Sequence, residues 1–471
     1  ALQKVQKPGR YVGGELNAVV KDPSQVEVRF AFCFPDTYEI GMSHLGIKIL
    51  YGAMNEIPYF WCERVFAPWV DMEEEMRREG IPLYGLESGD PVNQFDFIGF
   101  TLQYELSYTN VLNMLELAGI PLRSKDRPDL FNIVVGGGPC VCNPEPLADF
   151  FDLFFLGDGE EVDIEVMEIY RQCKKERKSK LEFLEKAAQV EGVYVPAFYD
   201  VSYNPDGTVK EYIPTHGVPK TVKKRVIRDM NKAYYPKDFV VPLIDVVHNR
   251  ISEEVLRGCI RGCRFCQAGF LYRPYREKSI ETIDRQCRDL CHSTGYDEIS
   301  LSSLSTSDYS HLNELIDTLH QWTEEDKVSL SLPSLRVDNF SPELMERINS
   351  VRKSGLTFAP EAGSQRMRDV INKNVTEEEL MHTVNVAFTE GWTRVKLYFM
   401  IGLPTETMED VLAILQLGQK VVDTFYANKE KPKGKGVEVS LSAAAFVPKP
   451  FTPFQWFGQD TMETLKEKQY A

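Results

Sequence analysis

Three cysteines stand close together in the segment LRGCIRGCRFCQAGF, at Cys259, Cys263 and Cys266. Their spacing is C-x3-C-x2-C, and the aromatic residue Phe265 directly precedes the last cysteine. Three thiolates this close can bind three irons of a four-iron cluster, which leaves the fourth iron open to substrate chemistry. The arginines between the cysteines favour the thiolate form and offset the negative cluster, while the glycines let the loop turn around it.

Two other interpretations of the triplet are a structural zinc site and three unrelated thiols. Zinc requires a fourth Cys or His ligand at a matching spacing. Cys287, Cys291 and His292 follow in the sequence, but in a stretch that is typical of a helix. The chain has ten cysteines, and the others are scattered. In a long chain this pattern indicates metal binding or catalysis rather than a disulfide framework.

The protein that must position this triplet is large and acidic. Its 471 residues predict two or three domains at roughly 150 residues per domain. The 43% hydrophobic and 26% charged residues are typical of a globular protein, and the net charge of −16 does not favour nonspecific nucleic-acid binding. We find neither the ~20 consecutive apolar residues of a membrane span nor a secretory signal at the N-terminus. We therefore expect a cytoplasmic protein with no membrane association.

The first part of the chain alternates apolar runs with helical stretches. Strands are expected at 26–35, 95–102, 132–138 and 151–159, and helices at 43–56, 106–119 and 160–178. This alternation predicts a parallel, doubly wound (Rossmann-like) sheet, in which ligands bind beyond the carboxyl ends of the strands. We assign this domain to residues 1–191. The next segment, 192–245, is expected to be a connector with a hairpin turning at Asn204–Gly207 and a basic stretch at 217–237.

Strands and helices alternate again from residue 246. One strand leads into Cys259, and others are expected at 297–305, 328–336, 356–360, 395–402 and 437–448, with helices such as 308–321, 341–353, 376–390 and 407–427. Six βα units between 246 and 456 fit a partial (βα)6 barrel better than an open sheet. Residues 457–471 are expected to begin a C-terminal helical extension. The predicted fold class is therefore α/β throughout.

The segment 246–456 resembles the core domain of the radical SAM superfamily, because the cysteine motif follows a strand and precedes βα units. The resemblance implies a 4Fe–4S cluster on the three cysteines, which binds S-adenosylmethionine (SAM) at its open iron and cleaves it reductively to a 5′-deoxyadenosyl radical. Residues 355–373 resemble the family's ribose- and carboxylate-binding segment, and 396–407 its G-x-P-x-E-T segment near adenine. The implied SAM-binding residues are Phe265, Ser303, Glu361, Ser364, Arg366, Gly402 and Glu406. The second strand ends in serines instead of the family's Gly-Gly-Glu, so the SAM amine ligand stays open among Ser303, Ser305 and Asp308.

A doubly wound domain ahead of such a barrel resembles the cobalamin-binding-domain subgroup of this superfamily. The whole chain is similar to radical SAM proteins that carry GRYVGGE near the start and FVPKPFTPFQW near the end. The implied cobalamin-binding residues are Tyr38, Gly41, Ser43, His44, Gln103, Glu105, Gly136, Gly137, Gly138, Gly157, Gly159 and Glu160. His44 lacks the Asp and the Gly of the D-x-H-x-x-G pattern. We therefore expect base-off cobalamin without a histidine ligand. A domain that keeps the fold without the corrin is the alternative.

These features predict a radical SAM enzyme that uses cobalamin to methylate an unactivated carbon. The substrate is left open between a small molecule, an RNA and a protein, and the electron donor is expected to resemble flavodoxin or ferredoxin. The alternatives are a radical methylthiotransferase, a cobalamin-independent radical SAM enzyme and a cluster-containing nucleic-acid-binding adaptor that uses the stretch 217–237. Methylthiotransferases carry three further cluster cysteines in their first domain. Here Cys33, Cys62 and the pair Cys140 and Cys142 form no obvious second triplet.

Overall fold

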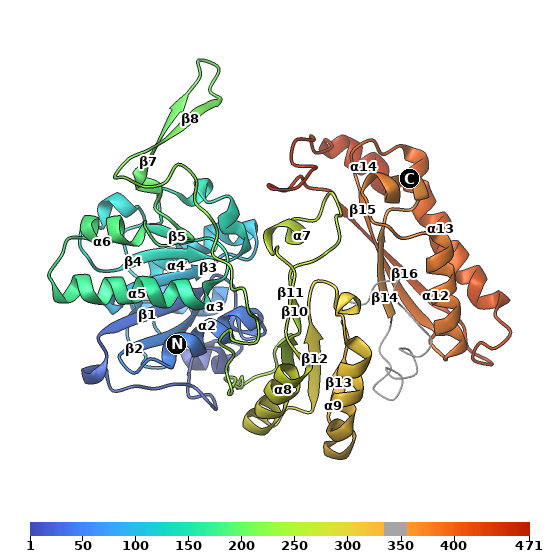
Figure 1. The fold of residues 1–471 in the computed structure, drawn as a ribbon, viewed down its shortest axis with the longest axis horizontal. Coiled ribbons are helices and arrows are strands. Elements are labelled where there is room, and N and C mark those ends of the chain that lie inside the picture. Colours follow the sequence, from blue (N-terminus) through green and yellow to red (C-terminus); the bar gives the residue numbers. More distant parts are fainter. Residues whose placement is uncertain (334–355) are drawn as a thin grey trace. The chain divides into compact units, whose positions relative to one another are not determined.

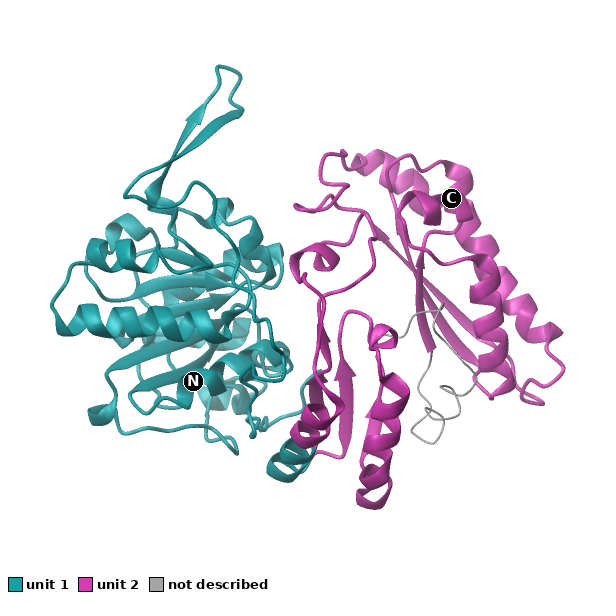
Figure 2. Cartoon of the chain, in the orientation of Figure 1, with its two compact units in different colours: residues 1–249, 288–295 teal, residues 250–287, 296–471 magenta. Residues whose placement is uncertain are grey.

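The computed structural model describes residues 1–333 and 356–471. It forms two compact units, residues 1–249 with 288–295 and residues 250–287 with 296–471 (Figure 2). The segment 192–245, expected as a connector between domains, differs from that expectation because it folds as part of the first unit. The predicted helix 341–353 and the end of the predicted strand 328–336 lie outside the described residues.

The first unit is built on one six-stranded sheet with the order β2-β1-β3-β4-β5-β6 (Figure 1). Its strands are β1 (Val28–Phe34), β2 (Phe60–Phe66), β3 (Phe97–Thr101), β4 (Ile133–Gly137), β5 (Leu153–Phe155) and β6 (Val193–Tyr194). All neighbours pair in parallel except β5 and β6. In this order the connections diverge at β1 and β3, and that switch point is where doubly wound sheets bind ligands.

Helices cover both faces of this sheet, as a doubly wound fold requires. In β1, Phe30 and Phe32 belong to one core, while Ala31 and Cys33 belong to the core on the other face. The first core also contains residues of α2 (Leu45–Asn55), α5 (Gly159–Lys175) and α6 (Lys180–Ala187), and the second contains residues of α3 (Val70–Glu79) and α4 (Tyr108–Leu117). A short helix, α1 (Tyr38–Gly41), follows β1. The four strands expected here are present, while β2 and β6 were not predicted.

Strand β2 carries two charged residues in its centre, Glu63 and Arg64, and every residue of the strand is buried. The Arg64 guanidinium pairs with the Glu15 carboxylate at 2.9 Å and with the Glu87 carboxylate at 2.6 Å. Burial opposes the ionisation of Glu15, but the Arg64 charge outweighs it and holds the pKa of Glu15 below its usual value. One arginine thus fixes the N-terminal segment and the loop after α3 to the strand.

The segment 196–249 contains an exposed hairpin, and after it the chain packs against the end of β5. Strands β7 (Tyr199–Tyr203) and β8 (Val209–Pro214) pair antiparallel around the predicted Asn204–Gly207 turn and project from the unit (Figure 1). Further along, the Arg225 amide donates to the Leu156 carbonyl at 2.8 Å, and the Asp158 amide donates to the Arg225 carbonyl at 3.0 Å. These backbone bonds explain why the segment belongs to the first unit.

The second unit contains two three-stranded parallel sheets, with the orders β13-β12-β9 and β14-β15-β16. The strands are β9 (Ile251–Glu254), β12 (Glu298–Ser302), β13 (Ser329–Ser331), β14 (Leu356–Glu361), β15 (Arg394–Ile401) and β16 (Glu438–Ala445). The helices are α7 (Ala268–Leu271), α8 (Ile280–Thr294), α9 (Leu312–Asp326), α11 (Gln365–Val370), α12 (Glu377–Thr389), α13 (Met408–Ala427) and α14 (Met462–Tyr470). The last part of α8, from Arg288 on, belongs to the first unit. All six predicted strands are present, and helices stand between successive strands wherever the connecting residues are described.

A short antiparallel pair, β10 (Leu256–Arg257) and β11 (Arg276–Glu277), flanks the cysteine segment of the second unit. Helix α13 begins with a capping box between Thr407 and Asp410 and packs on β15 and β16. In the described part of the chain, no helix has both the length and the apolar character needed to cross a membrane.

We predict that Arg64→Met destabilises the first unit, because it leaves the carboxylates of Glu15 and Glu87 buried without their cation. Breaking a buried ion pair in this way costs about 3–5 kcal/mol. Hydrogen exchange of the β1 and β2 amides measures the loss in that unit alone. Arg77→Met is the matched control: Arg77 is 43% exposed in its side chain and pairs with Glu73 and Glu116 on the surface, so we expect less than about 1 kcal/mol. Equal exchange in both variants would contradict the prediction.

Candidate active site

The cysteine segment begins with a turn that only glycine allows. Gly258, directly after β10, has a φ of 93°, and a Cβ there would lie 2.8 Å from the carbonyl oxygens of both Tyr272 and Pro274. The turn therefore brings the loop back against its own return strand. Cys259 and Cys266 are partly exposed, Cys263 is buried, and all three thiols are free of disulfides.

Contacts from three directions hold this loop in place. The Arg261 side chain pairs with Asp308 at the end of the segment after β12, with Nε 2.9 Å from the carboxylate. The Arg264 amide donates to the Ile371 carbonyl at 2.9 Å, and Phe265 packs against the small core formed by residues such as Met367. Because Asp308 already neutralises Arg261, it is a positioning residue for the loop rather than a free carboxylate for the SAM amine.

The loop offers three free thiols, the ligand set of a four-iron cluster with one open iron. Among residues 1–333 and 356–471, no three His, Cys, Asp or Glu side chains are gathered so that they could hold one ion. A zinc ion would require ligands that converge on one point. A four-iron cluster takes one thiolate per iron, so its ligands need only surround it. The Arg261 amide points at the Cys259 sulfur at 3.4 Å, a contact that favours negative charge on the sulfur.

Glu361 lies at the end of β14, beside the cysteine loop. It adopts a φ of 68°, rare for a residue with a side chain, and its carboxylate is 3.2 Å from the Lys373 ammonium. Burial raises the pKa of Glu361, and Lys373 partly offsets this effect. Burial also raises the pKa of the Cys266 thiol, on which the charges of Lys373 and Glu361 both act. The structure thus brings Glu361 close to a cluster cysteine, together with Lys373, which sequence reasoning missed.

Two other predicted SAM residues, Ser364 and Arg366, are engaged with a carboxylate that was not predicted. Ser364 caps α11 and donates a 2.6 Å hydrogen bond to Asp410, and Arg366 forms an ion pair with the same group. Burial opposes the ionisation of Asp410, but the hydrogen bonds from Arg366 and Ser364 hold its pKa well below the usual range. Asp410 thereby ties the turn after β14 to the start of α13.

The remaining SAM candidates also have partners within the unit. Glu406 accepts a hydrogen bond from the Gly402 amide at 2.7 Å and pairs with Lys468 of α14 at 2.8 Å. The Ser303 hydroxyl lies 2.8 Å from the Thr306 hydroxyl, while the buried Ser305 hydroxyl has no hydrogen-bond partner in the described residues. Of the predicted SAM residues, Phe265 and Glu361 are therefore the ones that the described contacts place at the cysteine loop.

Several predicted corrin residues of the first unit turn out to be packed or bonded internally. The Tyr38 hydroxyl donates to Glu15 at 3.0 Å and accepts from the Leu243 amide. A Cβ on Gly41 would lie 2.2 Å from the Phe66 ring. The Ser43 hydroxyl donates to the Glu39 carbonyl and accepts from the His248 amide. These three residues therefore build the support behind the sheet edge.

His44 lies between α1 and α2, and Gln103 follows the end of β3; their side chains are in contact. The His44 ring caps α2 by accepting from the Ile47 amide at Nδ1, 3.3 Å away. Burial lowers the pKa of His44 to about 4, although a hydrogen bond with Gln103 acts in the opposite direction. The imidazole is therefore neutral at pH 7. Gln103 also donates to the Thr101 hydroxyl at 2.6 Å.

The predicted glycines differ from one another in what surrounds them. A Cβ on Gly136 would lie 2.7 Å from Phe154, and one on Gly157 would lie 2.1 Å from the Arg225 carbonyl, so these two serve internal packing. Gly138, with a φ of 95°, fits under the backbone of Leu102. Gly137, at the carboxyl end of β4, has nothing within 4 Å of its Cβ position, so the space beside it is open.

The other predicted residues of this edge flank that opening along the chain. Glu105 begins a 3-10 turn, Glu105–Ser107, directly after the end of β3. Gly159 starts α5, with Leu50 and Asp163 beside it. Glu160 is buried in the first turn of α5.

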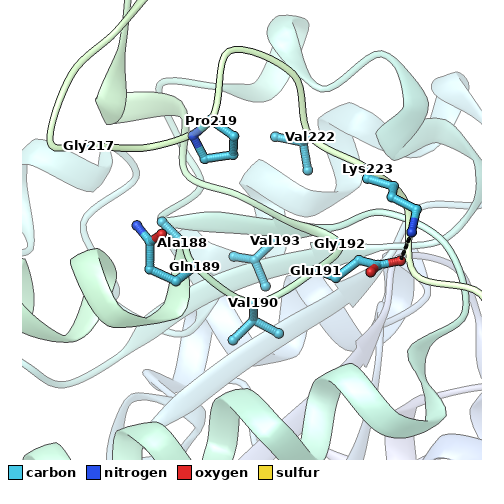
Figure 3. Close-up of a pocket in the computed structure, with 10 residues that line it drawn as sticks. All are labelled: Ala188, Gln189, Val190, Glu191, Gly192, Val193, Gly217, Pro219, Val222 and Lys223. Carbon is cyan, nitrogen blue, oxygen red and sulfur yellow. Dashed lines mark ion pairs between the residues drawn. The ribbon is translucent and has the colours of Figure 1, made fainter.

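A separate open hollow of about 360 Å³ lies elsewhere in the first unit, between residues 188–193 and 217–223 (Figure 3). Its floor is formed by Val190 and Val193, and the ion pair between Lys223 and Glu191, 3.1 Å, crosses one side. None of the predicted site residues lines it, and no group in its lining is suited to redox or transfer chemistry. We do not assign it to the active site.

The chain belongs to the radical SAM superfamily. A family model for the N-terminal region of radical SAM proteins matches residues 46–196, and the model of the radical SAM superfamily matches residues 254–418. The second match contains all three cysteines of the loop. The family predicted from the cysteine motif is therefore confirmed, and with it the assignment as an enzyme.

Among known proteins, an uncharacterised protein of Methanocaldococcus jannaschii is 29% identical over 434 residues, which are 90% of this chain and 78% of that protein. The ribosomal-protein methylthiotransferase RimO of Thermotoga maritima is 25% identical over 176 residues, 35% of this chain and 40% of its own length. The first relative spans both units, whereas the second matches only about a third of the chain.

Two solved structures share the fold along nearly the whole chain. TsrM of Kitasatospora setae, a radical SAM methyltransferase with cobalamin and a 4Fe–4S cluster bound, covers 90% of this chain and 76% of its own, with a TM-score of 0.61 and 14% identity. The cobalamin-dependent radical enzyme OxsB, with aqua-cobalamin and SAM bound, covers 94% and 61%, with a TM-score of 0.60 and 15% identity. The predicted fold class, a doubly wound domain followed by a radical SAM domain, is confirmed.

We predict that replacing Cys259, Cys263 and Cys266 together with Ala abolishes the broad iron–sulfur absorbance and all formation of 5′-deoxyadenosine. The reason is ligand count, because a cubane needs thiolates from this loop. Iron analysis and the ultraviolet–visible spectrum of anaerobically reconstituted protein measure the effect. Cys291→Ala, outside the loop, is the control and should keep the cluster. A triple variant that still binds about four irons per chain would overturn the assignment.

A second prediction concerns Glu361. If its carboxylate binds a hydroxyl of SAM beside the loop, Glu361→Gln weakens SAM binding by roughly 1–3 kcal/mol, the effect of one charged hydrogen bond. Equilibrium binding of SAM to the reconstituted protein measures the change, while the cluster content stays that of the wild type. Glu409→Gln, an exposed glutamate at the start of α13, is the matched control. Wild-type affinity in Glu361→Gln would return this residue to a purely structural role.

Proposed function

We propose that this enzyme cleaves SAM reductively at a 4Fe–4S cluster held by Cys259, Cys263 and Cys266, and uses cobalamin to methylate an unactivated carbon of its substrate. The observation that carries this proposal is that one chain contains both kinds of unit. The second unit has a loop with three free thiols that turns at Gly258. The doubly wound unit before it has open space beside Gly137 at the end of β4.

The first unit fits cobalamin at the carboxyl ends of β3 and β4. Gly137 leaves the edge open, Gln103 offers an amide, and the α2 cap residue His44 lies on the neighbouring β1 connection. Bound there, cobalamin would supply a methyl group for transfer to carbon. The residues of the chain would orient the corrin: the bare backbone at Gly137 permits close approach, while Gln103 and Glu105 provide polar contacts at the rim.

We further propose that no protein nitrogen binds the lower face of the cobalt. The His44 Nδ1 is already used to cap α2. A ligand histidine donates its other ring N–H to a carboxylate, a backbone carbonyl or a water, and the carboxylate raises its basicity most, whereas His44 is paired with the neutral Gln103. This arrangement supports base-off cobalamin with an open lower face.

The methylthiotransferase alternative requires three further thiols gathered in the first unit. Cys33 lies in the core on one face of the sheet, and Cys62 lies in the core on the other face. The sheet therefore separates them. Cys140 is buried on the Cys33 side, next to the partly exposed Cys142. This separation disfavours a second cluster in the described residues and supports the methylation proposal instead.

The nucleic-acid adaptor is disfavoured by the partners of the basic stretch 217–237. Arg225 pairs with Glu161 and Glu165 of α5, and Lys223 pairs with Glu191. These acids remove much of the charge that phosphate binding would need.

We propose that the enzyme takes its electron from a small reductant such as flavodoxin or ferredoxin. The free cysteines fit a reducing, cytoplasmic setting.

We predict that Gly137→Trp blocks cobalamin uptake, because its side chain would project from the open edge where the corrin would lie. Anaerobic reconstitution with hydroxocobalamin, followed by gel filtration and the visible spectrum of the bound fraction, measures uptake. His44→Ala should bind cobalamin with an unchanged spectrum. Gly458→Trp, at an exposed position of the second unit with nothing within 4 Å of its Cβ position, is the control for a bulky substitution.

Two outcomes would contradict this part of the proposal. A histidine-nitrogen coupling in the electron paramagnetic resonance of bound cobalamin would refute the absence of a histidine ligand. If the wild-type protein takes up no cobalamin while it binds the cluster, the methylation proposal fails and a cobalamin-independent radical SAM reaction takes its place.

A further inference from the structure

The sheet β14-β15-β16 has two unlike faces. On one face, Val395, Leu397 and Phe399 of β15 lie in the apolar core under α12 and α13. On the other face, Lys396 and Tyr398 of the same strand are exposed. Because helices cover the outer face of a βα barrel, this second face is its inner face. This inner face carries polar side chains, whereas a face packed in a protein core would carry apolar ones.

Polar residues of neighbouring strands line up in rows on this inner face. The strand register places Lys396 beside Thr357 of β14 on one side and beside Ser440 of β16 on the other. Neighbouring parallel strands lie about 5 Å apart. Lys396 therefore stands between two residues that carry hydroxyl groups, and all three lie on the same face of the sheet. The next row toward the carboxyl ends of the strands joins Tyr398 to Ser442.

The cation in this row has no acidic partner in the described residues. Lys396 makes no hydrogen bond or ion pair there, and its ammonium lies 4.7 Å from the centre of the Tyr398 ring. Glu438, the acidic residue of β16 on this face, stands opposite Arg394 in the strand register rather than opposite Lys396. The tyrosine ring keeps the ammonium over the sheet, and within the described residues no acid neutralises its charge.

We propose that Lys396, Thr357 and Ser440 form an anion-binding subsite that holds a carboxylate or phosphate group of the substrate. This inference rests on the proposed function, since it names the substrate class of the same active site. A lysine whose neighbours on both sides carry hydroxyl groups can offer the charge-assisted hydrogen bonds that an oxyanion requires. We commit to a small molecule that carries this group at one end.

The depth of the subsite sets a length for that molecule. Met400 and Phe265 pack against the same small core, so Met400 marks the level of the cysteine loop. Lys396 lies four residues earlier in β15, which corresponds to roughly 13 Å at about 3.3 Å per residue. The reacting carbon would therefore lie about that far from the anionic group.

Protection of the lysine from chemical labelling tests the subsite without requiring turnover. The reconstituted full-length enzyme is acetylated with an activated ester in inorganic phosphate, in acetate, or in chloride at equal ionic strength. Mass spectrometry then gives the rate at Lys396 and at Lys435, an exposed loop lysine that serves as the control. We expect phosphate or acetate to slow acetylation at Lys396 and leave Lys435 unchanged. The more protective anion identifies the group as phosphate or carboxylate.

The hydroxyls are tested with the double variant Thr357→Val and Ser440→Ala, which keeps the lysine. We expect the protecting anion to bind about tenfold more weakly or worse, as expected when hydrogen bonds to a charged group are lost. Equal protection of Lys396 and Lys435, or no protection at either, overturns the subsite. SAM cleavage and cobalamin uptake are measured on the same preparation, so a failed subsite with intact cleavage leaves the proposed function standing. Protection of Lys396 in a protein that fails to cleave SAM would contradict the proposed function and leave the anion-binding subsite standing.

Discussion

Parallel strands all end at the same edge of their sheet, and the chemistry of both units depends on this constraint. In the first unit, Gln103 follows the end of β3 and β4 ends at Gly137. In the second, β14 ends at Glu361, and the cysteine loop follows the end of the parallel strand β9 by way of the short strand β10. The apolar cores under the helices hold the strands far from these residues. The position of this edge is therefore fixed by burial elsewhere in each unit.

The sequence pattern predicts most of the strands because their apolar residues are continuous or alternate regularly, as in β1 and β15. It misses β2, since Glu63 and Arg64 interrupt the apolar run. Their burial depends on partners distant in the sequence, such as Glu15, that no local pattern reveals. The placement of 192–245 fails for a similar reason. It is decided by backbone bonds between Arg225 and the Leu156–Asp158 turn, which involve no recognisable side-chain signal.

The cysteines of the candidate site are predictable, because their chemistry lies in local spacing. The residues that support them are not. Lys373, Asp410 and Lys468 reach Glu361, Ser364 and Glu406 only through the fold. These contacts also change the interpretation of the predicted SAM segments. Arg366 and Glu406 hold the turns after β14 and β15 through ion pairs, so a motif that resembles a ligand-binding segment also builds the walls of the site.

The overall charge of the chain limits how a substrate can be recognised. A protein with a net charge of −16 does not attract anions from a distance, and salt screens charges beyond about 8 Å in any case. An anionic substrate must therefore gain its affinity from groups that contact it directly. Many surface cations, such as Arg225 and Lys223, already serve acids of the chain. Lys396 differs because the β-sheet, rather than an acid, fixes its surroundings: hydroxyls stand on both sides and an aromatic ring supports it. Such a group discriminates by geometry at short range, which suits an enzyme that must hold one carbon within reach of a radical.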